Sequence, residues 1–324
     1  MKYSLSSSTL QVFRQKPKMV ASGPRKIRLL LLLIILLFPL LLSPQPAAGD
    51  WSPLIDRLVA DGFDGLGIRY LFSRPEVQFE PRAMSSKMET LIKNQARKPA
   101  IVPSFQSKAV YKGPLKEKMI AQARSYLQEN KDLLERVSIQ YCIPKEIIVS
   151  ILLVETRLGE FLGGRGAFNS LASMALCMDL ETIRPYLPKK LVNSKNEEYA
   201  RTICRQKADW AYSELQALIL YAAYTGFDPL TLPGSIYGAI GICQFMPTNA
   251  LTYGVDADND GRIDLFVKAD ALYSIANYLR EHGWGCQMDR SGQHKAIYAY
   301  NHSVVYTNTI LAVAEKLKDK PRKK

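Results

Sequence analysis

The residue best placed to do acid–base chemistry is Glu155. It follows an apolar run, residues 147–154, which is interrupted by a single serine. A helix that is apolar on every side is buried, so this run predicts a buried helix ending near Glu155. There the carboxyl shares a helical face with Ile148, Ile151 and Leu152. Desolvation and the negative end of the helix dipole would raise its pKa, and a carboxyl protonated near neutral pH can act as a general acid.

The same position also fits a structural carboxylate. Glu155 could pair with Arg157 or Arg165 at the surface, and structural ion pairs perturb acids too. Helical spacing alone therefore favours the structural interpretation, and the surrounding motifs have to decide.

Three segments occur in order along the chain. Residues 154–159 read Val-Glu-Thr-Arg-Leu-Gly, residues 235–247 read Ser-Ile-Tyr-Gly-Ala-Ile-Gly-Ile-Cys-Gln-Phe-Met-Pro, and residues 300–306 read Tyr-Asn-His-Ser-Val-Val-Tyr. Residues 277–279 and 282–284 supply shorter matches. Together they resemble the motifs of the lytic transglycosylase B family (glycoside hydrolase family 103), from about residue 62 to about residue 314.

The resemblance implies a mainly α, lysozyme-like α+β fold: a helical catalytic domain with a small inserted subdomain that carries a calcium loop. It implies an enzyme that cleaves the bond between N-acetylmuramic acid and N-acetylglucosamine in peptidoglycan. Glu155 would protonate the bridging oxygen and then accept the proton of the muramic acid C6 hydroxyl, which closes on C1. The product would be a 1,6-anhydro sugar, and one carboxyl would suffice where ordinary glycosidases use two.

The resemblance also implies substrate-binding residues. Ser235 matches a hydroxyl beside the glutamate, and Gln244 matches an amide that binds the sugar N-acetyl region. A glutamine suits that partner because it offers both a donor and an acceptor. The remaining matches would line the cleft: Tyr300, Asn301 and Tyr306. By spacing alone, the two tyrosines would be ordinary partly buried aromatics.

An Asp-rich loop, residues 256–264, resembles the first part of an EF-hand loop, with acids at positions 1, 3, 5 and 9 and glycine at position 6. Position 12 is Val267 instead of the usual glutamate. The family carries a similar loop completed by an aspartate fifteen positions in. The resemblance therefore predicts structural Ca²⁺ held by Asp256, Asp258, Asp260, the Arg262 carbonyl and Asp270. The alternative is a solvated turn.

Helical spacing of apolar residues predicts the elements that carry these motifs. Helices are expected over residues 50–75, 114–140, 208–225, 269–282 and 304–317. Residues 76–113 read as extended or loop, and residues 186–206 as a polar surface excursion. Strand signals are few, so we expect a mainly α class with a small sheet.

Charge is concentrated at the ends of the chain. Residues 1–49 contain seven Lys/Arg and no acid, whereas residues 316–324 contain six Lys/Arg and one acid. The near-neutral body argues against nucleic-acid binding. Basic residues before the apolar run 29–42, with small residues after it, predict an export signal, or an uncleaved inner-membrane anchor, with Met19 as an alternative start. We therefore expect a signal or anchor at 1–49, an enzymatic domain at 50–315, a basic tail at 316–324, and a periplasmic or envelope location.

Five cysteines leave at least one unpaired within a single chain. Cys177 and Cys204 bracket the polar insert, which favours a bridge between them, and a bridge from Cys243 to Cys286 is a second hypothesis. No CxxC spacing occurs and there are three histidines, so zinc is not expected.

The chain departs from the family where a basic pair usually follows the catalytic segment. Residues 178–184 lack that pair, and Arg165 or Arg184 are candidate substitutes. Two other functions stay open: a muramidase that hydrolyses the same bond with the same glutamate, and a non-catalytic peptidoglycan-binding protein. We expect glycan strands as the partner, weak membrane or wall association through the anchor and the basic tail, and a monomer.

Overall fold

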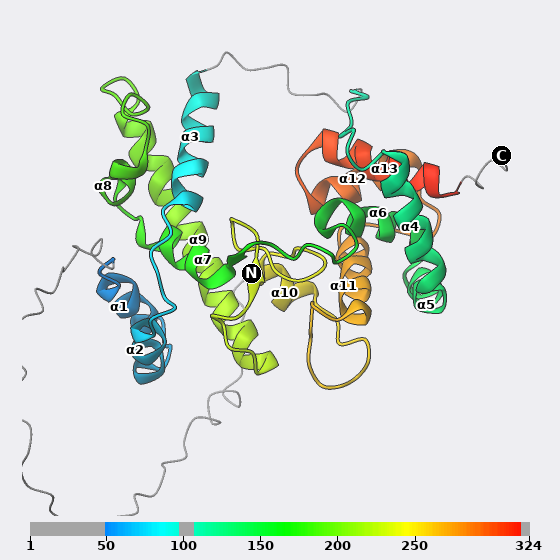
Figure 1. Ribbon diagram of the computed structural model, residues 1–324, viewed down its shortest axis with the longest axis horizontal. Coiled ribbons are helices and arrows are strands. Elements are labelled where there is room, and N and C mark those ends of the chain that lie inside the picture. Colours follow the sequence, from blue (N-terminus) through cyan, green and yellow to red (C-terminus); the bar gives the residue numbers. More distant parts are fainter. Residues whose placement is uncertain (1–48, 97–106, 319–324) are drawn as a thin grey trace, which may run out of the picture. The chain divides into compact units, whose positions relative to one another are not determined.

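Helices form nearly all of the regular structure in residues 49–96 and 107–318, the part that the computed structural model describes (Figure 1). These residues belong to one unit, residues 46–324. Most of the predicted export segment and residues 319–324 of the basic tail lie outside the described residues. The helices are α1 (Ser52–Ala60), α2 (Gly65–Ser73), α3 (Arg82–Ala96), α4 (Glu117–Glu129), α5 (Lys131–Tyr141), α6 (Lys145–Thr156), α7 (Ala167–Leu176), α8 (Leu180–Ile183), the 3₁₀ helix η2 (Arg184–Tyr186), α9 (Glu197–Thr225), α10 (Pro247–Tyr253), α11 (Lys268–Glu281), α12 (Arg290–Tyr300) and α13 (Val304–Lys318).

A two-stranded sheet completes the predicted mainly α class. β1 (Arg165–Gly166) pairs antiparallel with β2 (Pro233–Gly234), with Arg165 opposite Gly234. Isolated bridges continue from Gly234 to Ile240 and from Ile240 to Phe245. The sheet thereby joins the segment after α6 to the glycine-rich segment at 234–247.

Helix α6 is buried along almost its whole length, as its apolar run predicts. Residues 147–153 are buried, and the one polar side chain among them, Ser150, donates its hydroxyl to the Glu146 carbonyl at 2.6 Å. Fully burying each aliphatic side chain stabilises the fold by roughly 1.5–3 kcal/mol. The helix packs against α4, α5, α11 and α13 (Figure 1). It ends when Arg157 adopts a left-handed backbone conformation at φ 52°, close to the predicted end near Glu155.

Helix α9 is a second organising element, and it packs against α3, α7, α8 and α10 (Figure 1). It begins eleven residues before the predicted residue 208, so half of the predicted surface excursion is helical. Ala200, Ile203 and Cys204 are buried at helical spacing, and they extend the apolar face of the helix toward its N-terminus. Gly226 ends it in a left-handed conformation at φ 76°, which agrees with the predicted end at residue 225.

Two other predictions about the elements were wrong. Residues 76–113 contain helix α3, whose Met84, Met88 and Ile92 are buried; the prolines on either side of it obscured this spacing. Residues 50–75 form two helices instead of one. The chain turns at Gly62, at φ 95°, and Asp64 caps α2 by accepting a hydrogen bond from the Gly67 amide at 2.7 Å.

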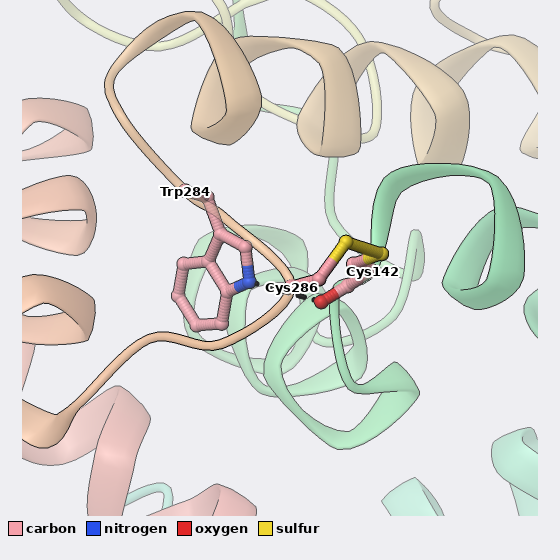
Figure 2. The surroundings of a disulfide bond; sticks show 3 residues. All are labelled: Cys142, Trp284 and Cys286. Carbon is pink, nitrogen blue, oxygen red and sulfur yellow. Dashed lines mark hydrogen bonds between the residues drawn. A yellow bond between two sulfur atoms is a disulfide. The ribbon is translucent and has the colours of Figure 1, made fainter.

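The disulfide predictions were also wrong. The bond joins Cys142, between α5 and α6, to Cys286, after α11, with 4.8 Å between their Cα atoms (Figure 2). Beside it, the Trp284 indole N–H donates to the Cys142 carbonyl at 3.1 Å. Sequence spacing could not reveal this pair, because 144 residues separate the two cysteines and only packing of the helices brings them together.

The other three cysteines are buried thiols. Cys204, predicted to pair with Cys177, instead donates its S–H to the Cys177 backbone carbonyl at 3.2 Å, and Cys177 donates to Ser173. Cys243, the suggested partner of Cys286, lies in the core. Burial raises the pKa of Cys204 to about 11 and that of Cys243 to about 12, so both thiols are inert near neutral pH.

Over residues 49–96 and 107–318, we find no single helix with the length and apolar character to cross a membrane. Helices α5 and α6 reach that threshold only as a pair, bent by 114°.

Candidate active site

Glu155 is the penultimate residue of α6 and is partly buried. The Tyr306 hydroxyl donates a hydrogen bond to its Oε1 atom at 2.6 Å. Tyr306 belongs to α13, which packs along α6 (Figure 1). Two helices about 150 residues apart in sequence therefore meet at the predicted acid and hold one of its oxygens in place.

Burial raises the pKa of Glu155 to about 7, while the hydrogen bond from Tyr306 works in the opposite direction. Among the described residues, no second carboxylate contributes to this shift and Glu155 forms no ion pair. Arg165, one of its suggested surface partners, instead binds Glu80 at 2.8 Å. A single isolated carboxyl that is half protonated near neutral pH is suited to both donating and accepting a proton.

The residue after the glutamate, Thr156, connects α6 to the glycine-rich segment. Its buried hydroxyl donates to the Ile242 carbonyl at 2.9 Å and accepts from the Gly159 amide at 3.0 Å. Close backbone approach strengthens the connection: a Cβ on Gly163 would lie 2.0 Å from the Gly234 carbonyl oxygen. Only glycine fits there.

Tyr300 links the glycine-rich segment to the glutamate. Its hydroxyl donates to the Cys243 carbonyl at 2.6 Å, and its ring lies parallel to that of Tyr306 with 6.5 Å between centroids. Burial, and then the nearby charges of Cys243 and Glu155, raise the pKa of Tyr300 well above its usual value. Tyr300 and Tyr306 thus form one cluster with Glu155.

Gln244 follows Cys243 and is held in a left-handed conformation at φ 53°, which is uncommon for a residue with a side chain. Its side-chain nitrogen donates to the Gly241 carbonyl at 3.0 Å and to the Leu162 carbonyl at 3.4 Å. No described donor contacts the amide oxygen, which leaves it available to accept from a ligand. Backbone strain of this kind gathers at functional sites.

Among the described residues, the other two predicted substrate residues form no hydrogen bond with Glu155. The Ser235 hydroxyl accepts from the Tyr237 and Ala239 amides at 3.2 Å and 3.0 Å, so it shapes its own turn. That hydroxyl can still donate outward. Asn301 is exposed and follows the last residue of α12. Its side chain makes no hydrogen bond with another described residue.

The Asp-rich loop lies between α10 and α11. Carboxylate oxygens of Asp256, Asp258 and Asp260 lie within 4.8 Å of one another, and Asp256 Oδ1 is buried without a hydrogen-bond partner. An unsatisfied buried carboxylate oxygen among three acids fits a hard cation. Asp270 is buried outside this group and accepts from the Ala257 and Asp264 amides at 2.9 Å and 2.7 Å, so it clamps both ends of the loop.

Sequence reasoning missed two residues that position the site. Thr156 was one, and Glu214, inside α9, was the other. The Glu214 carboxylate accepts from the Thr248 amide at 3.0 Å and from its hydroxyl at 2.8 Å, which caps the helix that follows Gln244. A charged residue within the apolar face of a long helix was the available signal, because buried acids need partners.

Comparison with known proteins places the chain in a class. The family model for the transglycosylase SLT domain matches residues 48–290, and the chain belongs to this family. The membrane-bound lytic murein transglycosylase B of Escherichia coli (strain K12) is 34% identical over 159 residues, which cover 49% of this chain and 37% of that protein. The matched part thus spans little more than a third of that relative.

Solved structures share the fold. The Escherichia coli lytic transglycosylase Slt35, determined with bulgecin A, has a TM-score of 0.62 and 22% identity, covering 84% of this chain and 93% of its own. Slt35 has also been solved with calcium. SltB3 from Pseudomonas aeruginosa, solved with NAG-anhNAM-pentapeptide, has a TM-score of 0.59 and 18% identity, covering 83% of this chain and 79% of its own. The predicted lysozyme-like lytic transglycosylase fold is thereby confirmed.

Proposed function

We propose that this chain is a peptidoglycan lytic transglycosylase. It cleaves the bond between N-acetylmuramic acid and N-acetylglucosamine and forms 1,6-anhydro-N-acetylmuramic acid. The observation that carries this proposal is the single carboxyl at the site, whose pKa burial raises to about 7. Family membership and the likeness to lytic transglycosylases give it further support.

Glu155 begins the reaction protonated and donates its proton to the glycosidic oxygen as the bond from C1 to that oxygen breaks. The N-acetylglucosamine leaves with a free hydroxyl. The C6 hydroxyl of the muramic acid then bonds to C1, and its proton passes to the Glu155 carboxylate. The acid is regenerated, no water is consumed, and no second carboxylate is needed, in contrast with ordinary glycosidases.

The surrounding residues hold the acid and the sugar. Tyr306 fixes one carboxyl oxygen at 2.6 Å, which leaves the other free to reach the substrate. Gln244 offers its unbonded amide oxygen to an N-acetyl N–H, and Ser235 offers its hydroxyl proton. The Tyr300 hydroxyl holds the Cys243 carbonyl beside Glu155. Asn301, at the exposed end of α12, offers its side-chain amide to the substrate.

The test compares the wild-type protein with Glu155→Gln on purified peptidoglycan sacculi, with products weighed by mass spectrometry. Wild type should release anhydro-muropeptides, and Glu155→Gln should lose at least about a thousandfold in rate because the proton donor is gone. Glu160→Gln is the matched control, because Glu160 is an exposed acid five residues away. Products one water heavier would instead show a muramidase, and unchanged release by Glu155→Gln would overturn the mechanism.

We further propose that the loop binds structural Ca²⁺ through Asp256, Asp258, Asp260 and the Arg262 carbonyl, with Asp270 completing the site. The three close carboxylates and the unsatisfied Asp256 oxygen support this, and a fold relative has been solved with calcium. Calorimetric titration should show uptake of Ca²⁺ that disappears in Asp258→Asn/Asp260→Asn and persists in the surface control Asp132→Asn. No uptake by the wild-type protein would refute the site.

We also propose that the protein is exported and works as a monomer at the cell envelope. Residues 1–49 would serve as a signal or inner-membrane anchor and residues 316–324 as a basic tail that associates weakly with membrane or wall. The sequence relative that matches half of the chain is a membrane-bound enzyme. Fractionation of cells that express the full chain tests the location, and light scattering tests the oligomeric state.

A further inference from the structure

The Asp-rich loop between α10 and α11 (Figure 1) ends against the glycine-rich segment of the active site. The Leu265 carbonyl, one residue after the loop, accepts a hydrogen bond from the Ile242 amide at 2.8 Å. A Cβ on Gly241 would lie 2.5 Å from the Leu265 Cβ, so only glycine lets the two backbones approach this closely. Gln244 lies two residues after Ile242. Leu265 therefore supports the segment that carries the proposed ligand of the sugar N-acetyl group.

Ile242 is held from its other side by the helix that carries the general acid. Its carbonyl accepts from the Thr156 hydroxyl at 2.9 Å, and Thr156 directly follows Glu155. The amide and the carbonyl of one residue thus connect the end of the Asp-rich loop to the end of α6. A displacement of Leu265 would therefore be transmitted to both sides of the site, toward Glu155 and toward Gln244.

Asp270 and Tyr221 hold the end of the loop in place. The buried Asp270 carboxylate accepts from the Asp264 amide at 2.7 Å and from the Ala257 amide, between two of the clustered aspartates, at 2.9 Å. The Tyr221 hydroxyl, on α9, accepts from the Leu265 amide at 3.2 Å. The acidic cluster is therefore joined to Leu265 by a short series of hydrogen bonds and covalent bonds.

The cluster carries charge that the loop itself does not neutralise. Carboxylate oxygens of Asp256, Asp258 and Asp260 lie within 4.8 Å of one another, and like charges at that separation repel. Arg262, the basic residue of the loop, is exposed and forms no ion pair with any described residue. A hard cation would offset the repulsion and tighten the loop, whereas the uncompensated loop would hold Leu265 less firmly.

Gln244 is sensitive to such loosening because its backbone is strained. It has φ 53°, in the left-handed region that residues with a side chain rarely adopt. A strained conformation persists only where the surrounding structure holds it in place, and here the neighbours Gly241 and Ile242 are held by Leu265. Order in the Asp-rich loop therefore favours the Gln244 conformation that can receive an N-acetyl group.

We infer that cation binding in the Asp-rich loop and glycan binding at Gln244 reinforce each other, with Leu265, Asp270 and Tyr221 as the positioning residues that couple them. The inference rests on the proposed function, which supplies both the Ca²⁺ site and an N-acetylated glycan. It goes beyond a structural role for the cation, because the protein then binds its substrate more tightly where a divalent cation is present. Coupling of two sites is reciprocal, so each ligand must raise the affinity for the other by the same factor.

Isothermal titration calorimetry measures both affinities in the full-length chain with Glu155→Gln, which should not cleave its ligand. The probes are Ca²⁺ and a soluble tetrasaccharide of alternating N-acetylglucosamine and N-acetylmuramic acid. We expect the tetrasaccharide to bind about tenfold more tightly in Ca²⁺ than in a chelator, within the usual range for coupled sites. Ca²⁺ should in turn bind about tenfold more tightly when the tetrasaccharide is saturating.

Tyr221→Phe tests how the two sites are coupled, because it removes the hydroxyl that holds the Leu265 amide and leaves the loop carboxylates in place. The coupling factor should fall from about tenfold to about threefold or less, while each ligand still binds. Tyr212→Phe is the matched control. It removes the hydroxyl of another buried tyrosine on α9, one that donates to Asp61, and the factor should stay about tenfold. Equal factors in the two variants would overturn the assigned coupling.

The outcomes separate this inference from the proposed function. Independent binding of Ca²⁺ and the tetrasaccharide would overturn the coupling and leave both proposed sites intact. Lack of Ca²⁺ uptake would refute the proposed cation site, and the coupling with it. Lack of tetrasaccharide binding in either condition would count against the proposed glycan site and would overturn the coupling as well.

Discussion

At the scale of single residues, the site depends on one carboxyl whose environment makes its ionised form unfavourable. Burial raises the pKa of Glu155 to about 7, and the Tyr306 hydroxyl partly offsets this by stabilising the carboxylate. The carboxyl is therefore partly protonated at neutral pH, and its ionised form lowers the stability of the folded protein. A folded-state pKa above the unfolded value means that stability falls as pH rises from about 4.5 to about 7.

The first prediction concerns the pH dependence of activity and its control by Tyr306. The kcat/KM of wild type should fall above pH about 7, because the free enzyme loses its general acid. In Tyr306→Phe, the hydrogen bond that lowers the pKa of Glu155 is lost. The falling limb should then move to higher pH while the maximum drops about tenfold or more, since the carboxyl is no longer fixed. A pH–rate profile checks both effects.

The raised pKa of Glu155 can also be tested independently, through the thermal stability of the protein. Glu155→Gln removes an ionisable group that is unfavourable when charged, so it should melt at a higher temperature than wild type at pH 8. At pH 5 the difference should be smaller, because the wild-type carboxyl is then mostly protonated. A Tyr306→Phe limb that stays in place or moves to lower pH would contradict the proposed role of this hydrogen bond.

At the scale of elements, the site is held by polar contacts between helices far apart in sequence. Thr156 joins the end of α6 to Ile242, and Glu214 in α9 caps the start of α10, just beyond Gln244. Burial raises the pKa of Glu214, while the Thr248 hydrogen bonds lower it. The Glu214 contact satisfies an orphan backbone amide in the first turn of α10.

The second prediction is that Glu214→Gln destabilises the protein by about 1–2 kcal/mol, because one acceptor of the cap becomes a donor. Gln244 lies just before the capped helix α10. Loss of the cap should therefore also displace Gln244 and raise the KM for substrate. Thermal unfolding and steady-state kinetics measure the two effects. Glu198→Gln, an exposed acid in the first turn of the same helix, serves as the control, and a Glu214 variant as stable as that control would refute the capping role.

At the scale of the whole molecule, the Cys142–Cys286 bond ties the junction of α5 and α6 to the loop after α11 (Figure 2). The helix that bears Glu155 begins three residues after Cys142. A crosslink across 144 residues restricts the unfolded chain strongly. An oxidising compartment, as the export signal predicts, would maintain the bond.

The third prediction is that Cys142→Ala/Cys286→Ala lowers the free energy of unfolding by roughly 2–5 kcal/mol. Activity at low temperature should change little, because the helices still pack against one another. Chemical denaturation compares this variant with Cys204→Ala, which removes a buried thiol that forms no bridge. If wild type with its disulfide intact and Cys142→Ala/Cys286→Ala were equally stable, the crosslink would have no stabilising effect.

The class of fold, the segments that carry the motifs, and the position of Glu155 at the end of an apolar helix could be predicted from the sequence. These depend on local periodicity and residue order, which a single chain displays directly. The sequence did not determine α3, whose flanking prolines hid its spacing, or the early start of α9.

The packing of the fold brings distant groups together. It placed Tyr306 on Glu155, Cys142 on Cys286, and Lys87 over Tyr237, and it left Cys177 and Cys204 as separate thiols. Such pairs depend on how whole helices pack, and packing follows the summed burial of many side chains instead of the spacing of any two. The chemistry of each group is therefore local, whereas its pKa and its partners are set by the neighbours that the fold provides.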